Sequence, residues 1–252
     1  MKRQVDKALV LVGGSGTRLR PFTYSITKQL LPIANKPVLF YILEKVRALG
    51  VREIGLVVSA PHAKETIRIV GDGSRWDARF TYLVQEEPRG LADTVRISRE
   101  FLGSSSFLMV LGDNVYGFDF AGIVADFLAH PCDGLLVTQR VEEPTRYGIV
   151  VVQPDGSVKS VVEKPSEALS DLALLGIYIF SPEIHRVMDS ISPSDRGELE
   201  LTNAVMGVIK AGRMVRHFSG EHPQGPRVHR RGLPHSEGHP GSLRLHWSGD
   251  FH

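Results

Sequence analysis

The residues with the clearest potential for chemistry lie near the start of the chain, in the segment VGGSGTR and shortly after it. Gly13, Gly14 and Gly16 follow a short apolar run, and glycines permit positive φ and a close approach of a ligand to the backbone. Successive N–H groups in such a loop can converge on an anion. Arg18 adds a guanidinium fork suited to phosphate oxygens, and Lys28 is a compact second cation. The pattern predicts a phosphate-binding loop.

This loop fits neither of two widespread glycine-rich phosphate sites. A P-loop ends in Gly-Lys-Ser/Thr, which the chain does not contain at this point. A dinucleotide-binding fingerprint has a further glycine where this chain has Leu19. Taken alone, the loop is equally compatible with a glycine-rich turn beside a surface arginine.

Asp113 is a second candidate, because it follows the apolar run FLMVLG and its carboxylate would project from a strand end. Hard oxygen ligands suit Mg²⁺, which proteins usually hold through one or two carboxylates together with phosphates and water. The alternative role for Asp113 is a turn or helix-capping aspartate. Gln85 also ends an apolar run, and its amide could read a base with one donor and one acceptor group.

These residues need elements that present them together. Apolar runs bounded by turn residues predict strands over 8–12, 54–58, 80–84 and 107–111. Apolar residues at helical spacing predict helices over 37–49 and 91–102. Alternating strands and helices favour a mostly parallel, doubly wound α/β sheet, which binds ligands beyond the carboxyl ends of its strands. The glycine loop and Asp113 both fall at such ends.

The pattern changes twice further along the chain. From Gly134 the segments GLLVTQRV, YGIVVVQPDGSVKSVVEKP and LALLGIYIF predict strands, and 182–191 and 199–212 predict helices. From Glu221 onward the sequence has no hydrophobic periodicity. Prolines and glycines are frequent there, and the segment contains six of the ten histidines. We expect this end to be disordered rather than a metal-binding histidine tract. The predicted division is a domain over 1–220 and a tail over 221–252.

Composition excludes several classes of protein. The chain has 252 residues, of which 42% are hydrophobic and 23% charged, as in an ordinary globular domain. A formal charge of +2 gives no general attraction to nucleic acid. No apolar stretch is long enough to span a membrane, and we expect no signal peptide, because the first apolar run is too short for one. Cys132 is the single cysteine. We therefore expect a cytoplasmic protein without disulfides, and the sequence leaves open whether it forms a homo-oligomer.

A longer pattern adds a family resemblance. The segment GGSGTRLRPFTYSITKQLLPIANKP resembles the signature of the sugar-1-phosphate nucleotidylyltransferases. The resemblance continues in order through VQEEPRGLA, LGDN, RYG, VEKP, LALLGIY and RGELELTN, and covers residues 7–218. It implies a Rossmann-like, doubly wound mixed sheet of the nucleotide-diphospho-sugar transferase (GT-A-like) type. The pair Lys28–Gln29 is most similar to the branch that makes dTDP-glucose.

The resemblance also implies a role for each matching residue. Nucleotide contacts are implied for Gly13, Gly14, Gly16, Thr17, Gln29, Gln85 and Gly90. Sugar phosphate contacts are implied for Asn114, Gly148, Glu163 and Lys164. The implied catalytic residues are Arg18, Lys28, Asp113 and Lys164, with Mg²⁺ on Asp113. The alternatives are purely structural roles: Gly90 would be a glycine at the start of a helix, and Glu163 and Lys164 would lie in an exposed turn. Glu198 is expected to cap a helix and orient loops.

The reaction implied is transfer of a nucleotidyl group, most similar to that of the glucose-1-phosphate thymidylyltransferases. The substrates would be dTTP and glucose 1-phosphate. Alternatives are a uridylyl- or guanylyltransferase acting on a related sugar phosphate, or a silent module that binds nucleotide sugars.

The resemblance ends near Glu221. Family members carry a second metal-binding aspartate in a Trp-x-Asp-Thr-Gly strand after the region of Val215, and this sequence has no such segment. Trp247 and Asp250 occur in a different order and context. A reading-frame shift near codon 221 would produce this kind of ending, which sequencing of the source DNA would test.

Overall fold

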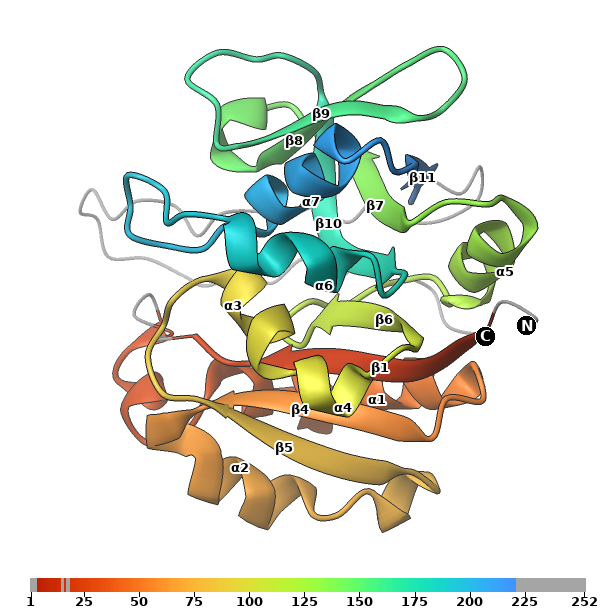
Figure 1. Cartoon of the computed structure of the whole chain (residues 1–252). Coiled ribbons are helices and arrows are strands. Elements are labelled where there is room, and N and C mark those ends of the chain that lie inside the picture. The colour runs from red at the N-terminus through yellow and green to blue at the C-terminus, as the bar shows by residue number, and fades with distance from the viewer. Residues whose placement is uncertain (1–3, 15, 17–18, 221–252) are drawn as a thin grey trace, which may run out of the picture.

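A nine-stranded mixed sheet forms the centre of the computed structural model, which describes residues 4–14, 16 and 19–220. Its strands are β1 (Val5–Val12), β4 (Glu53–Ser59), β5 (Arg79–Gln85), β6 (Ser106–Leu111), β7 (Gly134–Arg140), β8 (Gly148–Val152), β9 (Val158–Glu163), β10 (Leu172–Phe180) and β11 (Val215–Ser219). The order across the sheet is β11-β7-β10-β6-β1-β4-β5, and the β8–β9 hairpin pairs with β10 (Figure 1). A separate short hairpin consists of β2 (Pro32–Ile33) and β3 (Lys36–Pro37).

Helices cover both faces of this sheet. They are α1 (Val38–Ala48), α2 (Ala63–Val70), α3 (Leu91–Ile97), α4 (Arg99–Leu102), α5 (Ala121–Ala129), α6 (Ile184–Val187) and α7 (Leu201–Lys210). One apolar core joins α1, α2 and α5 to the sheet, and a second joins α3, α4, α6 and α7 to the opposite face. Successive strand residues point to opposite faces, so Ala8 and Val10 enter the first core while Leu9 and Leu11 enter the second. The predicted doubly wound architecture is confirmed.

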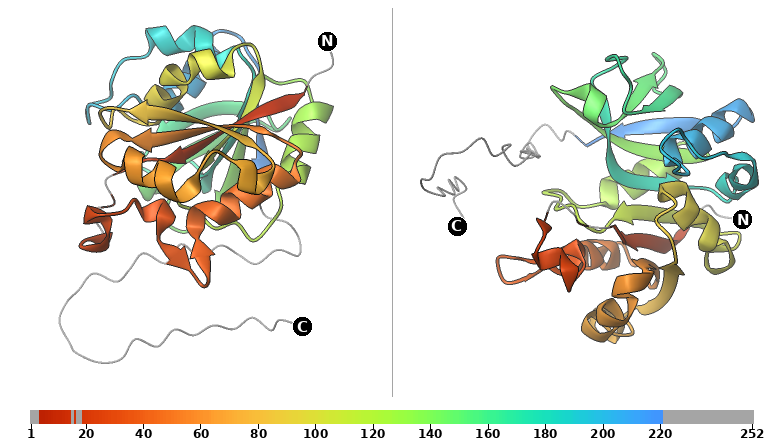
Figure 2. Two further views of the ribbon diagram at one scale, coloured as in Figure 1. Left: turned by 90° about the horizontal axis from the view of Figure 1, so that it is seen from below. Right: turned by 90° about the vertical axis from the view of Figure 1, so that its left-hand side faces the viewer.

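The first half of the sheet is parallel. β6, β1, β4 and β5 run side by side in the same direction, so their carboxyl ends share one edge. This edge lies on the left in Figure 1 and faces the viewer in the right-hand view of Figure 2. β1, β4 and β6 form here because each contains a short apolar run that is buried on both faces, whereas β5, at the edge of the sheet, is only partly buried.

The second half is mixed, as the resemblance implied. β10 runs antiparallel to both β6 and β7, and β11 is parallel to β7. The register of β10 shifts between Leu174 and Tyr178, around Gly176 with φ +83°. A Cβ at that glycine would lie 2.5 Å from Leu111 Cδ1, so only glycine lets β10 approach the end of β6 this closely.

Most of the predicted elements are present, with differences in detail. The helix predicted over 91–102 is divided into α3 and α4 at Ser98, whose hydroxyl donates to Thr94 O at 2.6 Å. Such a bond to the carbonyl four residues earlier can bend a helix. The sequence analysis did not identify α2, α5 or β11. The predicted tail lies outside the described residues. Within those residues, no helix is long and apolar enough to cross a membrane.

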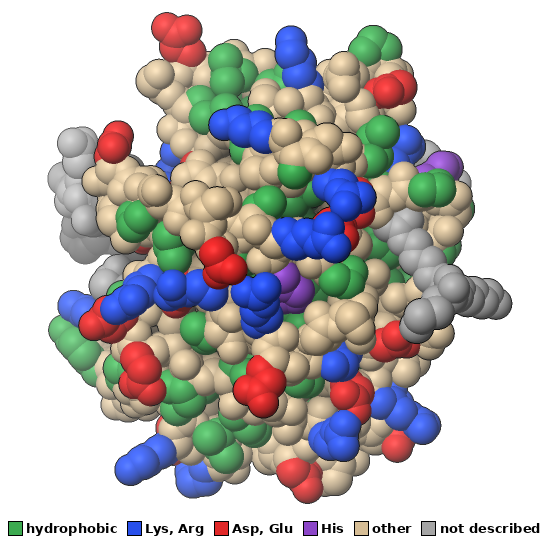
Figure 3. All heavy atoms as spheres, viewed as in Figure 1, with side chains coloured by type: hydrophobic (Ala, Val, Ile, Leu, Met, Phe, Trp, Pro, Cys, Tyr) green, Lys and Arg blue, Asp and Glu red, His purple; other side chains and the backbone are tan. Residues whose placement is uncertain are grey.

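Charges of both signs are mixed on the surface that Figure 3 shows. Several are paired: Arg99 with Asp189 at 3.1 Å, and both Arg186 and Arg213 with Glu183. Exposed pairs of this kind contribute little to stability, about 0–1 kcal/mol each. Their effect here is to leave the face without a continuous field of one sign.

Candidate active site

The residues predicted from sequence gather at the carboxyl edge of the parallel strands. The glycine loop directly follows β1, Gln85 is the last residue of β5, and Asp113 lies two residues beyond the end of β6. Ligands of open α/β sheets bind at this edge. The sheet order places β1 between β6 and β4, so the loop lies between Asp113 and the strands that carry Ser59 and Gln85.

Two glycines of the loop adopt backbone conformations that favour glycine. Gly14 has φ +122° and Gly16 has φ +55°. A Cβ at Gly16 would lie 2.8 Å from Thr23 Cγ2, and the Thr23 hydroxyl donates to Gly16 O at 2.7 Å. The loop is thus held against Thr23, and a side chain at position 16 would disrupt it. Thr17 and Arg18 lie outside the described residues.

Gln29 positions the glycine loop through a hydrogen bond to its backbone. Its side chain is 1% exposed, and its amide donates from Nε2 to Gly13 O at 2.8 Å. The Gln29 Oε1 accepts from the Thr27 hydroxyl, which also lies 3.3 Å from Val12 O. Both ends of the amide are therefore engaged within the protein. The structure gives Gln29 a positioning role, and the direct contact with the nucleotide that the resemblance implies stays a prediction.

Lys28 and Asp113 meet beside the glycine loop. Lys28 Nζ forms an ion pair with Asp113 Oδ2, and the two side chains are 30% and 27% exposed. The Lys28 Cε would lie 3.6 Å from a Cβ at Gly14, so the lysine extends across the loop. Asp113 is held here because Gly112 N donates to Leu11 O at 2.9 Å, where a Cβ on Gly112 would approach that oxygen to 2.6 Å. A cation, a carboxylate and loop amides thus share one partly open site.

Gln85 is oriented by a buried carboxylate. Its Nε2 donates to Asp93 Oδ2 at 2.8 Å and lies 3.3 Å from Gly90 O. Asp93 is 3% exposed and also accepts from Arg96 Nε at 3.1 Å. An ionised carboxylate is an acceptor only, so it fixes the amide nitrogen toward the protein. Gln85 then offers its oxygen as an acceptor for an N–H group of a ligand.

Gly90 begins α3 and packs on a distant segment. It has φ +100°, and a Cβ there would lie 2.5 Å from Leu199 O. Main-chain bonds join the same two segments: Leu199 N donates to Arg89 O at 2.7 Å, and Ala92 N donates to Leu199 O at 2.9 Å. The helix-start interpretation of Gly90 is therefore correct, and its nucleotide contact stays a prediction.

The predicted sugar phosphate residues lie on the hairpin of β8 and β9. Gly148 is the register partner of Glu163, and a Cβ there would lie 3.0 Å from Glu163 Oε2. Lys164 follows with φ +41°, and its Nζ lies 3.9 Å from Glu163 Oε1. The structure adds Arg196, whose Nη2 lies 3.6 Å from Glu163 Oε1. Burial and the neighbouring Glu200 raise the pKa of Glu163, against the opposing effect of Lys164 and Arg196.

Arg196 and Glu200 form a bridge that the sequence analysis did not assign. Arg196 Nη2 and the Ser194 hydroxyl both donate to Glu200 Oε1, at 2.6 and 2.9 Å. Arg196 and Glu200 are four residues apart in the RGELE motif, and this i, i+4 spacing was the signal in the sequence that could have predicted the pair. Glu200, and not Glu198, is the residue at the N-cap of α7. The expected capping role of Glu198 is therefore wrong, because the helix begins two residues later.

Asn114 connects the end of β6 to β10. Its Nδ2 donates to Tyr116 Oη at 3.0 Å and to Leu175 O at 3.2 Å, and Tyr116 is buried. These bonds fix the loop that carries Asp113. A sugar phosphate contact of Asn114 stays a prediction.

Asp113 is the carboxylate available for a metal ion at this site. Among the described residues, no group of three or more histidine, cysteine, aspartate or glutamate side chains could hold a metal ion. Mg²⁺ does not need such a group, since it is often bound by one carboxylate, water and substrate phosphates. The donor set therefore fits a metal that arrives with a phosphate ligand.

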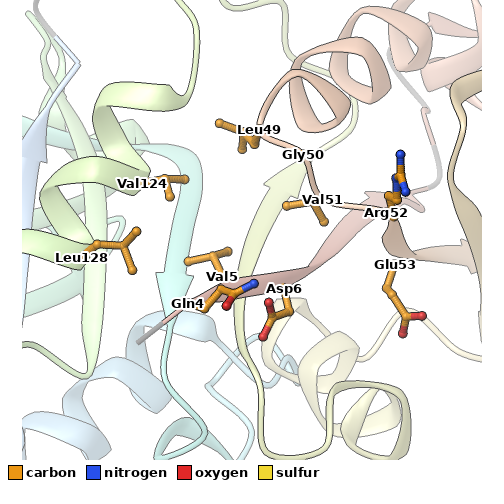
Figure 4. A pocket seen from close by; sticks show the side chains of 10 residues that line it. All are labelled: Gln4, Val5, Asp6, Leu49, Gly50, Val51, Arg52, Glu53, Val124 and Leu128. Carbon is orange, nitrogen blue, oxygen red and sulfur yellow. The ribbon is translucent and has the colours of Figure 1, made fainter. Parts of the chain in front are cut away.

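A separate pocket of about 410 Å³ lies at the opposite edge of the sheet, where β1 and β4 begin (Figure 4). Val5, Leu49, Val124 and Leu128 form its apolar lining. None of the candidate site residues predicted from sequence lines this pocket.

Comparisons with known proteins identify the family of the chain. Residues 7–223 match the profile of the nucleotidyl transferase family. A glucose-1-phosphate thymidylyltransferase of Streptomyces griseus is 50% identical over 210 residues, which are 83% of this chain and 59% of that protein. The protein of the same name from Neisseria gonorrhoeae is 37% identical, covering 78% of this chain and 69% of its own length.

Solved structures show the same fold. A crystal structure from Bacillus anthracis with a sucrose, assigned as a glucose-1-phosphate thymidylyltransferase, has a TM-score of 0.78 at 28% identity and covers 84% of this chain and 86% of that one. A UDP-glucose pyrophosphorylase in complex with UDP-glucose has a TM-score of 0.75 at 23% identity, and the match covers 86% of this chain and 92% of that one. The chain spans 59% and 58% of the curated Streptomyces griseus and Streptomyces antibioticus relatives.

Proposed function

Since the chain belongs to the nucleotidyl transferase family, we propose that it transfers a deoxythymidylyl group from dTTP to glucose 1-phosphate, giving dTDP-glucose and pyrophosphate. The observation that carries the proposal is the meeting of Lys28, Asp113 and the glycine loop at one edge of the sheet. The names of the relatives support the choice of substrates.

The chemistry requires two anions to meet. An oxygen of the sugar phosphate attacks the α-phosphorus of the triphosphate in line, a P–O bond forms, and the bond to the leaving pyrophosphate breaks. No covalent enzyme intermediate is needed, so positioning and charge stabilisation can supply most of the rate. The loop amides of Gly13, Gly14 and Gly16 would bind phosphate oxygens, and Lys28 would stabilise charge on the leaving group.

The sugar phosphate would bind on the β8–β9 side. Lys164 is 52% exposed and its ammonium can meet the phosphate, while the Glu163 carboxylate can accept from sugar hydroxyls. Arg196 Nη2 lies 3.6 Å from the same Glu163 oxygen, Oε1, that Lys164 approaches. Thr17 and Arg18 keep the nucleotide contacts that the resemblance implies.

Mg²⁺ is the cofactor that we propose, held by Asp113 together with the phosphates of the nucleotide. Bound there, it would neutralise phosphate charge and orient the groups that react. A metal ion held by one carboxylate and by the phosphates of the nucleotide would bind together with the nucleotide. In the free protein, Lys28 compensates the charge of Asp113 instead.

Two alternatives stay open. A uridylyl- or guanylyltransferase would use the same machinery with a different base. A silent module that binds nucleotide sugars is favoured by one observation: among the described residues, no group of three or more histidine, cysteine, aspartate or glutamate side chains could hold a metal ion.

Detection of released pyrophosphate tests the proposal. The purified chain is incubated with Mg²⁺, glucose 1-phosphate and each of dTTP, UTP, GTP and ATP. We expect release with dTTP above the others. Release with another triphosphate would reassign the base, and affinity for dTDP-glucose without any release would indicate the silent module.

A further inference from the structure

Three neighbouring strands end in a row that faces α3. Val12 pairs with Val58 and Ser59 pairs with Gln85, so the ends of β1, β4 and β5 place Gly13, Ser59 and Gln85 side by side. The nearest atom to a Cβ on Gly13 would be Ser59 N at 3.8 Å. Ser59 therefore lies between a residue of the glycine loop and the amide that Asp93 orients.

The side chains of this row share one face of the sheet. Val57 and Leu83, two residues before Ser59 and Gln85, pack in the core under α3. Residues two apart in a strand point to the same face. Ser59 and Gln85 thus continue this face to the edge of the core, beside the glycine loop.

The Ser59 hydroxyl is buried without a hydrogen-bond partner among the described residues. Burial of an unpaired hydroxyl is unfavourable, and such groups in a native structure need an explanation. Two described threonines near the loop differ: Thr23 donates to Gly16 O, and Thr27 donates to Gln29 Oε1. Unlike these two hydroxyls, that of Ser59 is unsatisfied.

We propose that Ser59 Oγ hydrogen-bonds the base of the nucleotide, an inference that rests on the function proposed above. The order of strands favours the base, rather than the phosphates, as the part of the nucleotide that Ser59 contacts. Asp113 and Lys28 lie on the β6 side of the glycine loop, whereas Ser59 and Gln85 lie on its other side. A triphosphate at the loop would direct its base toward β4 and β5.

The chemistry of the two side chains defines the kind of base. Gln85 offers an acceptor, because Asp93 fixes its amide nitrogen. Ser59 can donate its hydroxyl proton to a carbonyl oxygen. A ring N–H beside a carbonyl matches this pair, as in thymine, uracil and guanine, but not in cytosine or adenine. Ser59 and Gln85 together therefore select against bases that lack the N–H.

The test measures binding of dTTP and of inorganic tripolyphosphate, by calorimetry, to the wild type and to Ser59→Ala. We expect about tenfold weaker binding of dTTP, the size of one lost hydrogen bond, with unchanged affinity for tripolyphosphate. The melting temperature of the free variant should equal or exceed that of the wild type, because an unpaired buried hydroxyl is removed. A structural role for Ser59 would lower it instead.

Ser98→Ala is the matched control, since Ser98 is a buried hydroxyl that is satisfied by Thr94 O. It should lower the melting temperature and leave dTTP affinity unchanged. If Ser59→Ala binds dTTP as tightly as the wild type does, the assignment of Ser59 is wrong but the proposed function stands. The same holds if Ser59→Ala loses affinity for tripolyphosphate as much as for dTTP. Failure of the wild type to bind dTTP would overturn the proposed function and the assignment with it.

Discussion

Lys28 forms an ion pair with Asp113, from segments that follow different strands of the sheet. The lysine lies in a 3₁₀ turn over 28–30, and the aspartate follows β6. Their contact places a carboxylate that suits a metal ion within reach of the cation that would bind phosphate. Under the proposed function, a bound nucleotide and its metal ion would give each member of the pair a new partner of opposite charge, so the pair could separate without leaving an uncompensated charge.

Asp113→Asn is expected to reduce turnover at saturating Mg²⁺ and substrates by about 100-fold or more, the scale of removing one stabilising group at a reacting phosphate. Steady-state release of pyrophosphate measures it. Asp119→Asn is the control, because Asp119 lies in the same connection and its Oδ1 accepts from Ala121 N at 2.9 Å. The control should keep wild-type turnover. An active Asp113→Asn variant would remove Asp113 from the metal role.

Lys164→Ala is expected to raise the KM for glucose 1-phosphate more than the KM for dTTP. The ammonium lies beside Glu163, on the hairpin away from the glycine loop. Kinetics with each substrate varied in turn separate the two constants. Lys159→Ala, an exposed lysine on the same strand, should change neither. Equal increases in both constants would argue against the assignment.

Glu163→Gln is expected to stabilise the free protein at neutral pH while it weakens binding of the sugar phosphate. Burial and Glu200 raise the pKa of Glu163 above its ordinary 4.5, so folding favours its neutral form. Its contribution to stability is therefore fully present below pH 4.5 and is lost as pH rises through the folded-state pKa. The gain in melting temperature should be largest at neutral pH and disappear in acid. A gain independent of pH would contradict this explanation.

His185 is expected to make the protein less stable as pH falls below 6.5. Its ring is 5% exposed, stacks on Phe107 at 6.1 Å, and has no hydrogen-bond partner among the described residues. Burial, assisted by the charge of Arg99, lowers its pKa, so the unfolded chain binds the proton first. Thermal unfolding above and below pH 6.5 should show a loss in the wild type that His185→Phe reduces. Identical pH profiles would contradict the role of His185.

The strands and the edge at which the candidate residues meet could be predicted from sequence, because short aliphatic runs and turn residues are local signals. Gln29 shows the limit of that approach. The sequence gives no sign that its amide is buried and donates to Gly13 O, because that bond joins residues 16 positions apart that only the fold brings together. Arg196 is a second case, since its approach to Glu163 depends on how the segment before α7 passes the β8–β9 hairpin. Thr17, Arg18 and the tail from 221 lie outside the described residues.

The backbone bonds between Arg89, Leu199 and Ala92 have a consequence for protein engineering. They join the loop that carries Gly90 to the loop that precedes α7, with Gly90 packed so closely against Leu199 O that no side chain fits at that position. If Gly90 lies beside the base, as the resemblance implies, we expect base preference and sugar preference to be coupled. A chimera that imports the neighbourhood of Gly90 from a relative must import the neighbourhood of Leu199 as well, or it will misfit both substrates at once.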